Sequence, residues 1–295
     1  MSVKKSDRIK TIASKVANLP TLPTVVAKLL DLVDNPKTRT ETLAKLISSD
    51  PALTARILKT ANSEYYGLSG EISTVDTAIV VMGYSSVKEM GLSLTVFDNF
   101  KNIGALSRFD VQKYWEHSIG VGVTARAIAR NYLPSDSAEI FVAGLLHDIA
   151  KMILVQYMPQ DFYDVLDFAE KNELPFFEAE QEILGVNHAE IGAMIAKRWK
   201  LPQKIGDIIY YHHSPALAPK KYIVHAAITD VADAVCHLSK IGNPNHRPNA
   251  AVSPQTVAIF DKDGSFDEKE IARLQENLFA EIEQNEVLHS LLGAE

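Results

Sequence analysis

The sequence predicts an all-α protein that consists of two helical bundles. Apolar residues recur at the 3.6-residue spacing of a helix in nearly every segment, and capping residues or prolines stand at the segment ends. No segment shows the apolar and polar alternation of a convincing strand. Thr256–Phe260 is the one strand candidate, and its residues suit a helix equally well.

The first 105 residues are expected to form a compact bundle of about five short helices. A rigid, proline-containing opening at Leu19–Thr24 precedes them. The expected helices are Val25–Val33, Glu41–Ile47, Ala52–Asn62, Thr74–Met82 and Ser85–Phe97. Asp34-Asn35-Pro36 stops the first of them, and Ser49-Asp50-Pro51 caps the third with proline at its first helical position. This half contains no catalytic constellation.

The second half is expected to be helical as well. The expected helices are Phe109–Tyr132, a helix through His147 that ends before Pro159, Asp161–Lys171, Pro175–Leu184, a helix from His188 to Leu201-Pro202, Gln203–Tyr211, Lys221–Lys240 and Asp267–Leu291. Asp136 with Glu139 is interpreted as a capping box for the His147 helix, and Asn187 with Glu190 as one for the His188 helix. Small residues in Phe109–Tyr132 predict close helix packing. Residues 243–253 are expected to form a proline- and asparagine-rich loop.

Composition excludes several classes of protein. The single cysteine, Cys236, excludes an internal disulfide and indicates a reducing, cytoplasmic location. No apolar run approaches the length of a membrane span, and no secretory signal is present. The net charge is −7, with 13 basic against 10 acidic residues up to residue 105 and 17 against 27 after it. The sequence has no cluster of basic residues, so it does not predict nucleic-acid binding. The change in composition predicts two domains, 1–105 and 106–295.

Side chains that bind metals gather in the second half. None of the nine histidines precedes position 117, and seven fall between 117 and 237. The candidate metal ligands are His117, His147, Asp148, His188, His212, His213 and Asp230. Imidazole with carboxylate suits iron, manganese, zinc or nickel. One tetrahedral metal site needs only four ligands, which is fewer than these seven. Two metals about 3.5–4 Å apart, bridged by Asp148, would use all seven.

Each of these residues also has an ordinary structural interpretation. A lone histidine in a helix is more often packed or exposed than a ligand, and His225, His237, His246 and His289 are assigned to that group. His237 can pair with Asp233 at a spacing of four residues. Asp230 can serve as a cap or in an ion pair. Lys151 can extend to solvent, pair with an acid, or offset negative charge on a substrate.

The order of these residues resembles the HD superfamily of metal-dependent phosphohydrolases. Leu145–Lys151 (LLHDIAK) is similar to the LLHDIGK run of the HD-GYP branch, and Ile228–Ala234 (ITDVADA) resembles its AD-x-x-DA segment, which implies a ligand role for Asp230. Over residues 15–240 the chain is more similar to HDOD proteins, the HD-related output domains of bacterial signalling. That resemblance rests on four further segments of the first half: Leu19–Pro23, Ser49–Leu53, Ala61–Ser63 and Ala78–Gly83.

Departures from these patterns narrow the expected function. The glutamate used in three-metal HD-GYP sites would fall near Lys113, and the sequence after His213 lacks the GYP motif that recognises cyclic di-GMP. Cyclic di-GMP hydrolysis is therefore not expected. HDOD domains as a class are taken to have lost catalysis, yet this sequence retains the ligand residues that most of them lack.

Two functions follow from the resemblance. The favoured one is a bacterial signalling module that holds two divalent metals, most readily iron or manganese and alternatively zinc or nickel, and acts by binding a signalling protein partner. The alternative is a metal-dependent phosphohydrolase or phosphodiesterase that acts on a phosphorylated small molecule. Asp148 and Lys151 would then be its catalytic residues, with a metal-bridging hydroxide as nucleophile. A metal-based redox or oxygen sensor is a third possibility that the ligand set alone supports.

Overall fold

The computed structural model confirms the all-α fold. It describes residues 2–19, 24–33, 37–63, 66, 70–100, 108–242, 251–260 and 268–283. These ranges contain no β-strand, and the strand candidate Thr256–Phe260 lies within the helix α15 (Pro254–Phe260). Within the described residues, none of the helices is both long and apolar enough to cross a bilayer. The predicted loop at 243–253 lies mostly outside the described residues.

The chain divides into two compact units. The smaller contains Thr21–Asn102, and the larger contains Met1–Pro20 together with Ile103–Glu281. The helices of the smaller unit are α2 (Thr24–Val33), α3 (Thr40–Ser48), α4 (Pro51–Ala61), α5 (Val75–Met82) and α6 (Tyr84–Phe100). Buried aliphatic side chains from all five of these helices form its core, among them Leu29, Leu43, Ile57, Ile79 and Val87.

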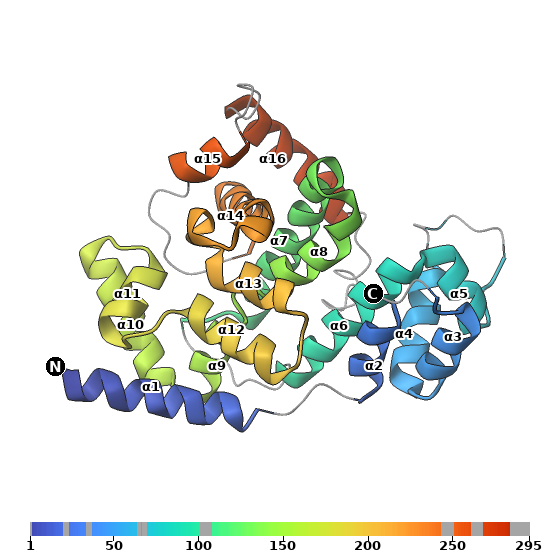
Figure 1. Ribbon diagram of the computed structural model, residues 1–295, viewed down its shortest axis with the longest axis horizontal. Helices are drawn as coiled ribbons and strands as arrows, with labels where there is room; N and C mark the ends of the chain where they lie inside the picture. The colour runs from blue at the N-terminus through green and yellow to red at the C-terminus, as the bar shows by residue number, and fades with distance from the viewer. Residues whose placement is uncertain are drawn as a thin grey trace. The chain divides into compact units, whose positions relative to one another are not determined.

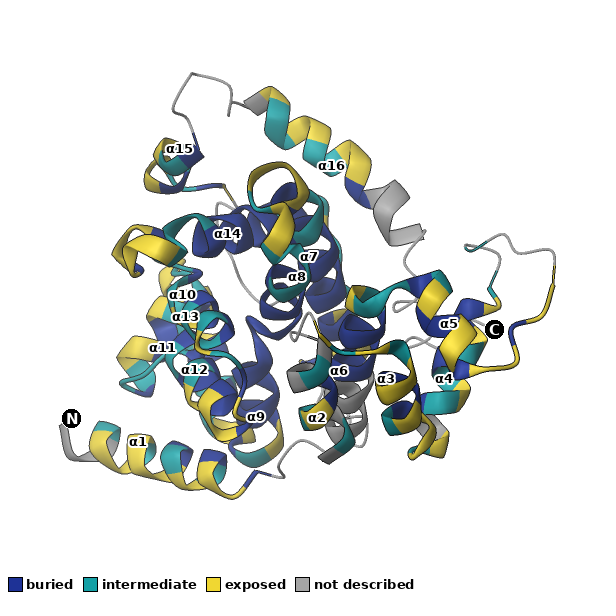
Figure 2. Ribbon diagram, turned by 45° about the vertical axis from the view of Figure 1, so that its right-hand side comes forward, coloured by how far each residue is buried: buried dark blue, intermediate teal, exposed yellow. Residues whose placement is uncertain are grey.

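The larger unit contains eleven α-helices among its described residues. They are α1 (Ser2–Ala17), α7 (Val111–Tyr132), α8 (Ser137–Leu146), α9 (Ile149–Tyr157), α10 (Pro159–Asn172), α11 (Phe176–Ile183), α12 (His188–Arg198), α13 (Gln203–Tyr211), α14 (Ile223–Leu238), α15 and α16 (Glu268–Glu283) (Figure 1). Buried residues dominate α7, α8 and α14 (Figure 2), and α7 packs against both of the others. These three helices form the centre of the unit.

Helix α1 was not predicted, and it packs against helices from the second half of the chain. Its Arg8 Nη1 donates a 2.8 Å hydrogen bond to the Ile183 carbonyl, and Arg8 Nε lies 2.6 Å from Asp161 Oδ1. Ile12 and Val16, four and eight residues after Arg8, are buried on the same side of the helix. The predicted domain 1–105 included these residues, so the described units and the predicted domains differ at α1.

Two glycines allow α7 and α8 to approach closely. A Cβ atom at Gly144 would lie 3.0 Å from Gly122 Cα and 3.1 Å from the Val121 carbonyl. Any larger residue at this crossing would push the helices apart, because packed interiors hold few voids. The crossing lies one turn before His147, so it fixes how near the end of α8 comes to His117 on α7.

The predicted continuous helix through His147 is wrong. The chain forms α8 and α9 instead, with His147 and Asp148 between them. The His147 ring provides a physical reason, because its Nδ1 donates a 2.7 Å hydrogen bond to the Gly144 carbonyl near the end of α8. Asp136 forms no capping hydrogen bond here, whereas the capping box of Asn187 and Glu190 is present.

Candidate metal centre

Six of the seven predicted ligands converge in the larger unit. His117 comes from the second turn of α7, and His147 and Asp148 from the break between α8 and α9. His188 is the first residue of α12, and His212-His213 follow α13 directly. Five of these six side chains are buried, and His213 is half-buried. Most of the cluster therefore lies at helix ends, so its side chains come from several junctions between helices rather than from one face of a single helix.

The first group of side chains surrounds Asp233 rather than the predicted Asp230. His117 Nε2 lies 3.0 Å from Asp233 Oδ1, and His147 Nε2 lies 3.7 Å from the same atom. His237 Nε2 approaches that oxygen to 3.3 Å. Asp233 is therefore the acid of α14 that these histidines approach.

Asp230 is turned away from this group. Its Oδ2 accepts a 2.6 Å hydrogen bond from Thr256 Oγ1 on α15. Both acids are on α14, but three residues of helix rotate a side chain by about 300°. Asp230 therefore faces α15 while Asp233 faces α7, so the structure brings Asp233 and not the predicted Asp230 into the group of histidines.

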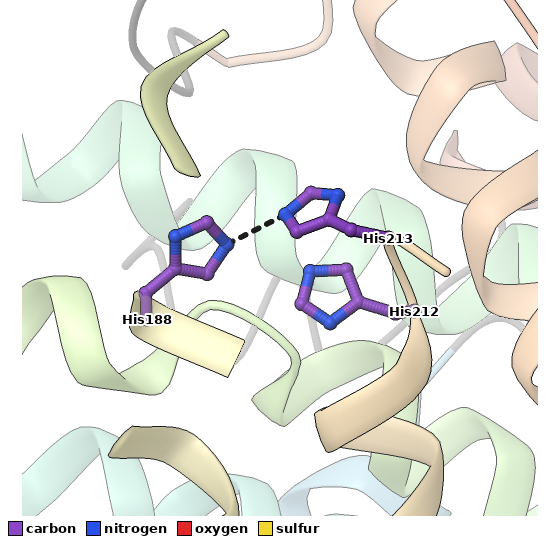
Figure 3. A group of neighbouring side chains, drawn as sticks. All are labelled: His188, His212 and His213. Carbon is purple, nitrogen blue, oxygen red and sulfur yellow. Dashed lines mark hydrogen bonds between the residues drawn. The ribbon is translucent and has the colours of Figure 1, made fainter. Parts of the chain in front are cut away.

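The second group consists of three histidines, drawn in Figure 3. His213 Nε2 lies 2.8 Å from His188 Nε2, and His212 stands beside them with its ring centroid 3.9 Å from that of His213. The ring of His213 also stacks on Phe177 at 4.3 Å. Candidate ligand atoms from all three lie within 4.8 Å of one another, which is close enough to surround one ion.

Asp148 lies between the two groups. Its Oδ1 is 3.0 Å from His188 Nε2, and its Oδ2 is 3.4 Å from His147 Nε2. Lys151 is buried and donates to Asp148 Oδ2 at 2.5 Å, so the interpretation that it extends to solvent is excluded. One carboxylate thus faces both groups.

Hydrogen bonds orient three of the histidines in the same way. The Nδ1 atoms of His147 and His212 lie 2.7 and 2.6 Å from the Gly144 and Ile209 carbonyls, and His188 Nδ1 lies 2.5 Å from Glu180 Oε2. These oxygens only accept, so Nδ1 carries a proton in each ring. Nε2 is then the atom available to a metal, an arrangement common around protein metal sites.

For His117, His212 and Asp148 the environment favours the protonation states that metal ligands need, whereas the pKa of His188 is raised to about 9 and a metal would have to displace its proton. Burial lowers the pKa of His117 to about 4, against the opposing effect of Asp233. Burial and the nearby His147 also hold the pKa of His212 well below its usual range. For Asp148, burial raises the pKa, but the charges of His147, Lys151 and His188 outweigh it and hold the value well below 3.8. Neutral imidazoles and an ionised carboxylate are the forms that bind divalent metals.

The donor set fits divalent metal ions. Among the described residues, the buried Nε2 atoms of His117, His147 and His212 have no aligned hydrogen-bond partner. Buried polar atoms in this condition cost about 1–3 kcal/mol each, so three in one cluster indicate a missing partner. Imidazole and carboxylate donors without thiolates suit iron, manganese, zinc or nickel.

Sequence reasoning missed three residues of this site: Asp233, His237 and Glu180. His237 was assigned to a structural pair with Asp233, and the two residues do lie together. Glu180 is fully buried and carried no motif that would have identified it. Of the other histidines, His225 pairs with Asp136 at 2.7 Å, and His246 and His289 lie outside the described residues.

Comparison with known proteins gives a family for most of the chain. The HDOD domain matches residues 19–215. An uncharacterized protein of Treponema pallidum is 24% identical over 215 residues, which are 72% of this chain and 41% of that protein. Ribonuclease Y of Thermus thermophilus is 31% identical over 123 residues, which are 42% of this chain and 17% of the enzyme. The chain therefore spans less than half the length of these curated relatives.

Solved structures resemble the chain over nearly its whole length. An HDOD domain protein of unknown function from Geobacter sulfurreducens is 26% identical, with a TM-score of 0.72 and coverage of 96% of this chain and 98% of that one. A protein from Shewanella amazonensis that is described as a candidate phosphohydrolase is 25% identical, with a TM-score of 0.71 and coverage of 95% and 97%. These likenesses agree with the helical architecture described above.

Proposed function

The chain belongs to the HDOD domain family, and from that membership we propose that its larger unit holds two divalent metal ions and serves mainly as a regulatory module in signalling. The first ion would be held by His117, His147, Asp148 and Asp233, and the second by His188, His212, His213 and Asp148. Iron and manganese are the favoured metals, with zinc and nickel as alternatives. A signalling protein would be the partner.

The position of Asp148 carries the two-metal proposal. Its two oxygens face different groups of histidines, at 3.0 and 3.4 Å from the nearest Nε2 atoms. A carboxylate that faces two ligand groups is the usual bridge of a binuclear site. Without metals, the buried Nε2 atoms of His117, His147 and His212 would lack aligned partners, at a cost of about 1–3 kcal/mol each.

Burial of the ligands supports a stabilising role. His117, His147 and His212 are fully buried, and Asp148 is 2% exposed. Ions at these positions would join α7, the α8–α9 break, α12, α13 and α14, which are distant in the sequence. A metal that binds only the folded state adds about 2.7 kcal/mol of stability at 100 times its Kd. The bound ions would thereby hold this unit in one conformation for a partner to recognise.

A second candidate is a metal-dependent phosphohydrolase or phosphodiesterase, which the buried Lys151 favours. Two divalent metals supply Lewis acidity and lower the pKa of bound water. Lys151 would add a positive charge beside Asp148 and offset negative charge on phosphoryl oxygens. The likeness to the Shewanella protein also supports this candidate, with a phosphorylated small molecule as substrate.

Metal analysis of the whole protein tests the proposal. The wild type, purified without added metal, should contain about two transition-metal ions per chain, and Asp148→Asn should lose most of both. Asp136→Asn is the matched control, because Asp136 also faces a histidine but lies in an ion pair with Lys204. Metal-free wild type would contradict the proposal.

Activity separates the two candidates. The wild type is assayed with manganese or iron against nucleotides, cyclic dinucleotides and aryl phosphates. Hydrolysis that Asp148→Asn abolishes would favour the enzyme over the regulatory module. Metal binding without hydrolysis of any of these substrates, together with a fall in thermal stability after chelation, would support the regulatory module.

A further inference from the structure

We propose that His237 is a fifth protein ligand of the first metal ion and closes the coordination position that water or a substrate would otherwise take. This inference rests on the metal centre proposed above and goes beyond it, because it assigns a new ligand and makes the first ion a structural one. Neither the order of motifs nor the family resemblance assigns any role to His237.

Three imidazoles surround a single oxygen of Asp233. The Nε2 atoms of His117, His237 and His147 lie 3.0, 3.3 and 3.7 Å from Asp233 Oδ1. Ligand atoms about 2.1 Å from one ion lie about 3.0–3.4 Å from each other at octahedral or tetrahedral angles. The two shorter separations fall in this range, so His117, Asp233 and His237 fit the edges of one coordination shell.

Hydrogen bonding alone explains the convergence poorly. A carboxylate oxygen has about two lone-pair positions, which is fewer than the three imidazoles that approach it. His117 and His237 also stand edge to face, with ring centroids 5.0 Å apart, and their Nε2 atoms are directed at the same region. A cation among these atoms would satisfy the nitrogen lone pairs and the carboxylate together.

Helix α14 places His237 correctly for this role. Asp233 and His237 are four residues apart, so they share one face of the helix. After α14 the chain turns back onto α7, where Gly242 lies so close that a Cβ atom would be 2.8 Å from the His117 backbone nitrogen. The end of α14 is thus held against the turn of α7 that carries His117, which fixes His237 beside it.

A second histidine on the same helix provides a natural comparison. His225 Nε2 lies 2.7 Å from Asp136 Oδ2, and Lys204 Nζ lies 3.1 Å from the other oxygen of that carboxylate. There a lysine supplies the positive charge. Around Asp233, three histidines approach a single oxygen, and a metal cation among them would play the part that the lysine plays at Asp136.

Exposure indicates which position His237 would close. The side chain of His237 is 11% exposed, whereas those of Asp233 and His117 are 4% and 0% exposed. His237 is therefore the member of the group nearest to solvent. With His117, His147, Asp148 and Asp233 it would give the first ion five protein ligands. Catalytic sites keep a position open for water, whereas structural sites are closed by protein ligands.

Manganese binding and water relaxation test the assignment. Full-length wild type, His237→Ala, His237→Gln and the control His225→Ala are loaded with Mn²⁺, and the stoichiometry, affinity and water-proton relaxation per bound ion are measured. We expect His237→Ala to lower the affinity for one of the two Mn²⁺ ions by about 10–100-fold. Where Mn²⁺ still occupies the first site of this variant, it should relax water protons faster than in the wild type, because loss of the imidazole opens a coordination position on the ion. His225→Ala should match the wild type in both measurements.

The glutamine variant separates a ligand from a structural hydrogen bond. Glutamine can still donate to Asp233, so a purely structural role predicts wild-type affinity and relaxation for His237→Gln. A ligand role predicts that His237→Gln behaves like His237→Ala, and His237→Gln remains informative if the alanine variant does not fold. Unchanged Mn²⁺ affinity and relaxation in both variants would overturn the inference while leaving the two-metal proposal intact. A wild type that binds no Mn²⁺ would overturn both.

Discussion

Glu180 is joined to His188 by two interactions of a single oxygen. Glu180 Oε2 accepts a 2.8 Å hydrogen bond from the His188 backbone N–H and lies 2.5 Å from His188 Nδ1. Glu180 is fully buried on α11, and His188 begins α12, so the carboxylate fixes both the start of the helix and the orientation of the ring. Burial alone would lower the pKa of His188, but Glu180 and Asp148 raise it to about 9.

Glu180→Gln should weaken metal binding at the second group of histidines. A carboxylate that accepts from the distal nitrogen of a histidine ligand increases the basicity of the ligating nitrogen, and its removal typically costs 10–100-fold in affinity. The first group should keep its ion, because the Glu180 carboxylate bonds to His188 and not to His117 or His147. Competitive titration with a chromophoric chelator measures the two affinities. Glu178→Gln, an exposed change on the same helix, is the control and should have no effect.

Gly242→Ala should destabilise the larger unit and disturb the first group. Gly242 has a φ of +67°, and a Cβ atom there would clash with the Lys113 carbonyl oxygen. The left-handed backbone alone costs about 1–2 kcal/mol with alanine, and the clash adds to it. Urea denaturation of the metal-free protein measures the loss in free energy of unfolding, and metal titration measures the loss of affinity.

Gly206→Ala is the matched control for this prediction. An added Cβ at Gly206 would meet only Ala196 Cβ, at 3.7 Å, which is an ordinary contact. Gly206 lies inside α13, where alanine is favoured over glycine by about 1 kcal/mol. We therefore expect this variant to be unchanged or slightly more stable. Equal stability of the two variants would contradict the assigned role of Gly242.

The ion pairs of Asp136 should contribute stability above the pKa of a free carboxyl and lose it in acid. Burial opposes ionisation of Asp136, but hydrogen bonds from His225 and Lys204 outweigh it and lower its pKa. A lowered pKa in the folded state means that the stabilisation is complete above 3.8 and disappears as the pH falls through the folded value. Asp136→Asn should cost about 1 kcal/mol at pH 6. In urea titrations this difference should narrow from pH 5 to pH 3, and a constant difference would contradict the assignment.

Local sequence patterns predicted the helices well where the signal is short-range. The capping box of Asn187 and Glu190 depends on four consecutive residues, and it is present. The supposed box of Asp136 and Glu139 has the same pattern, but His225 and Lys204 bind Asp136 from other helices. Tertiary partners thus overrode an identical local signal. Such competition is invisible in a single segment.

The sequence predicted which types of residue gather at the candidate site, but it did not predict which of two nearby acids on one helix faces the histidines. Asp230 and Asp233 are both buried on α14, and only the rotation of that helix about its axis decides which one faces His117. That rotation depends on packing against α7 and α15, which the sequence of α14 does not encode alone. Glu180 lay beyond prediction for a related reason. Its role depends on α11 ending beside the start of α12, and a lone acid in an amphipathic helix gives no signal of that.

Cys236 should be inert in the folded protein, although it lies in α14 between Asp233 and His237. Its thiol is fully buried near Thr124 Oγ1, and burial raises its pKa well above the usual range. Only the thiolate reacts with disulfide reagents, so both access and ionisation oppose reaction. A colorimetric thiol assay should detect no fast-reacting group in the native protein and one per chain in guanidinium chloride. Labelling of the native protein then requires α14 to open locally, so removal of the metals by a chelator should accelerate the labelling. Rapid labelling of the metal-loaded protein would contradict the packing described for this helix.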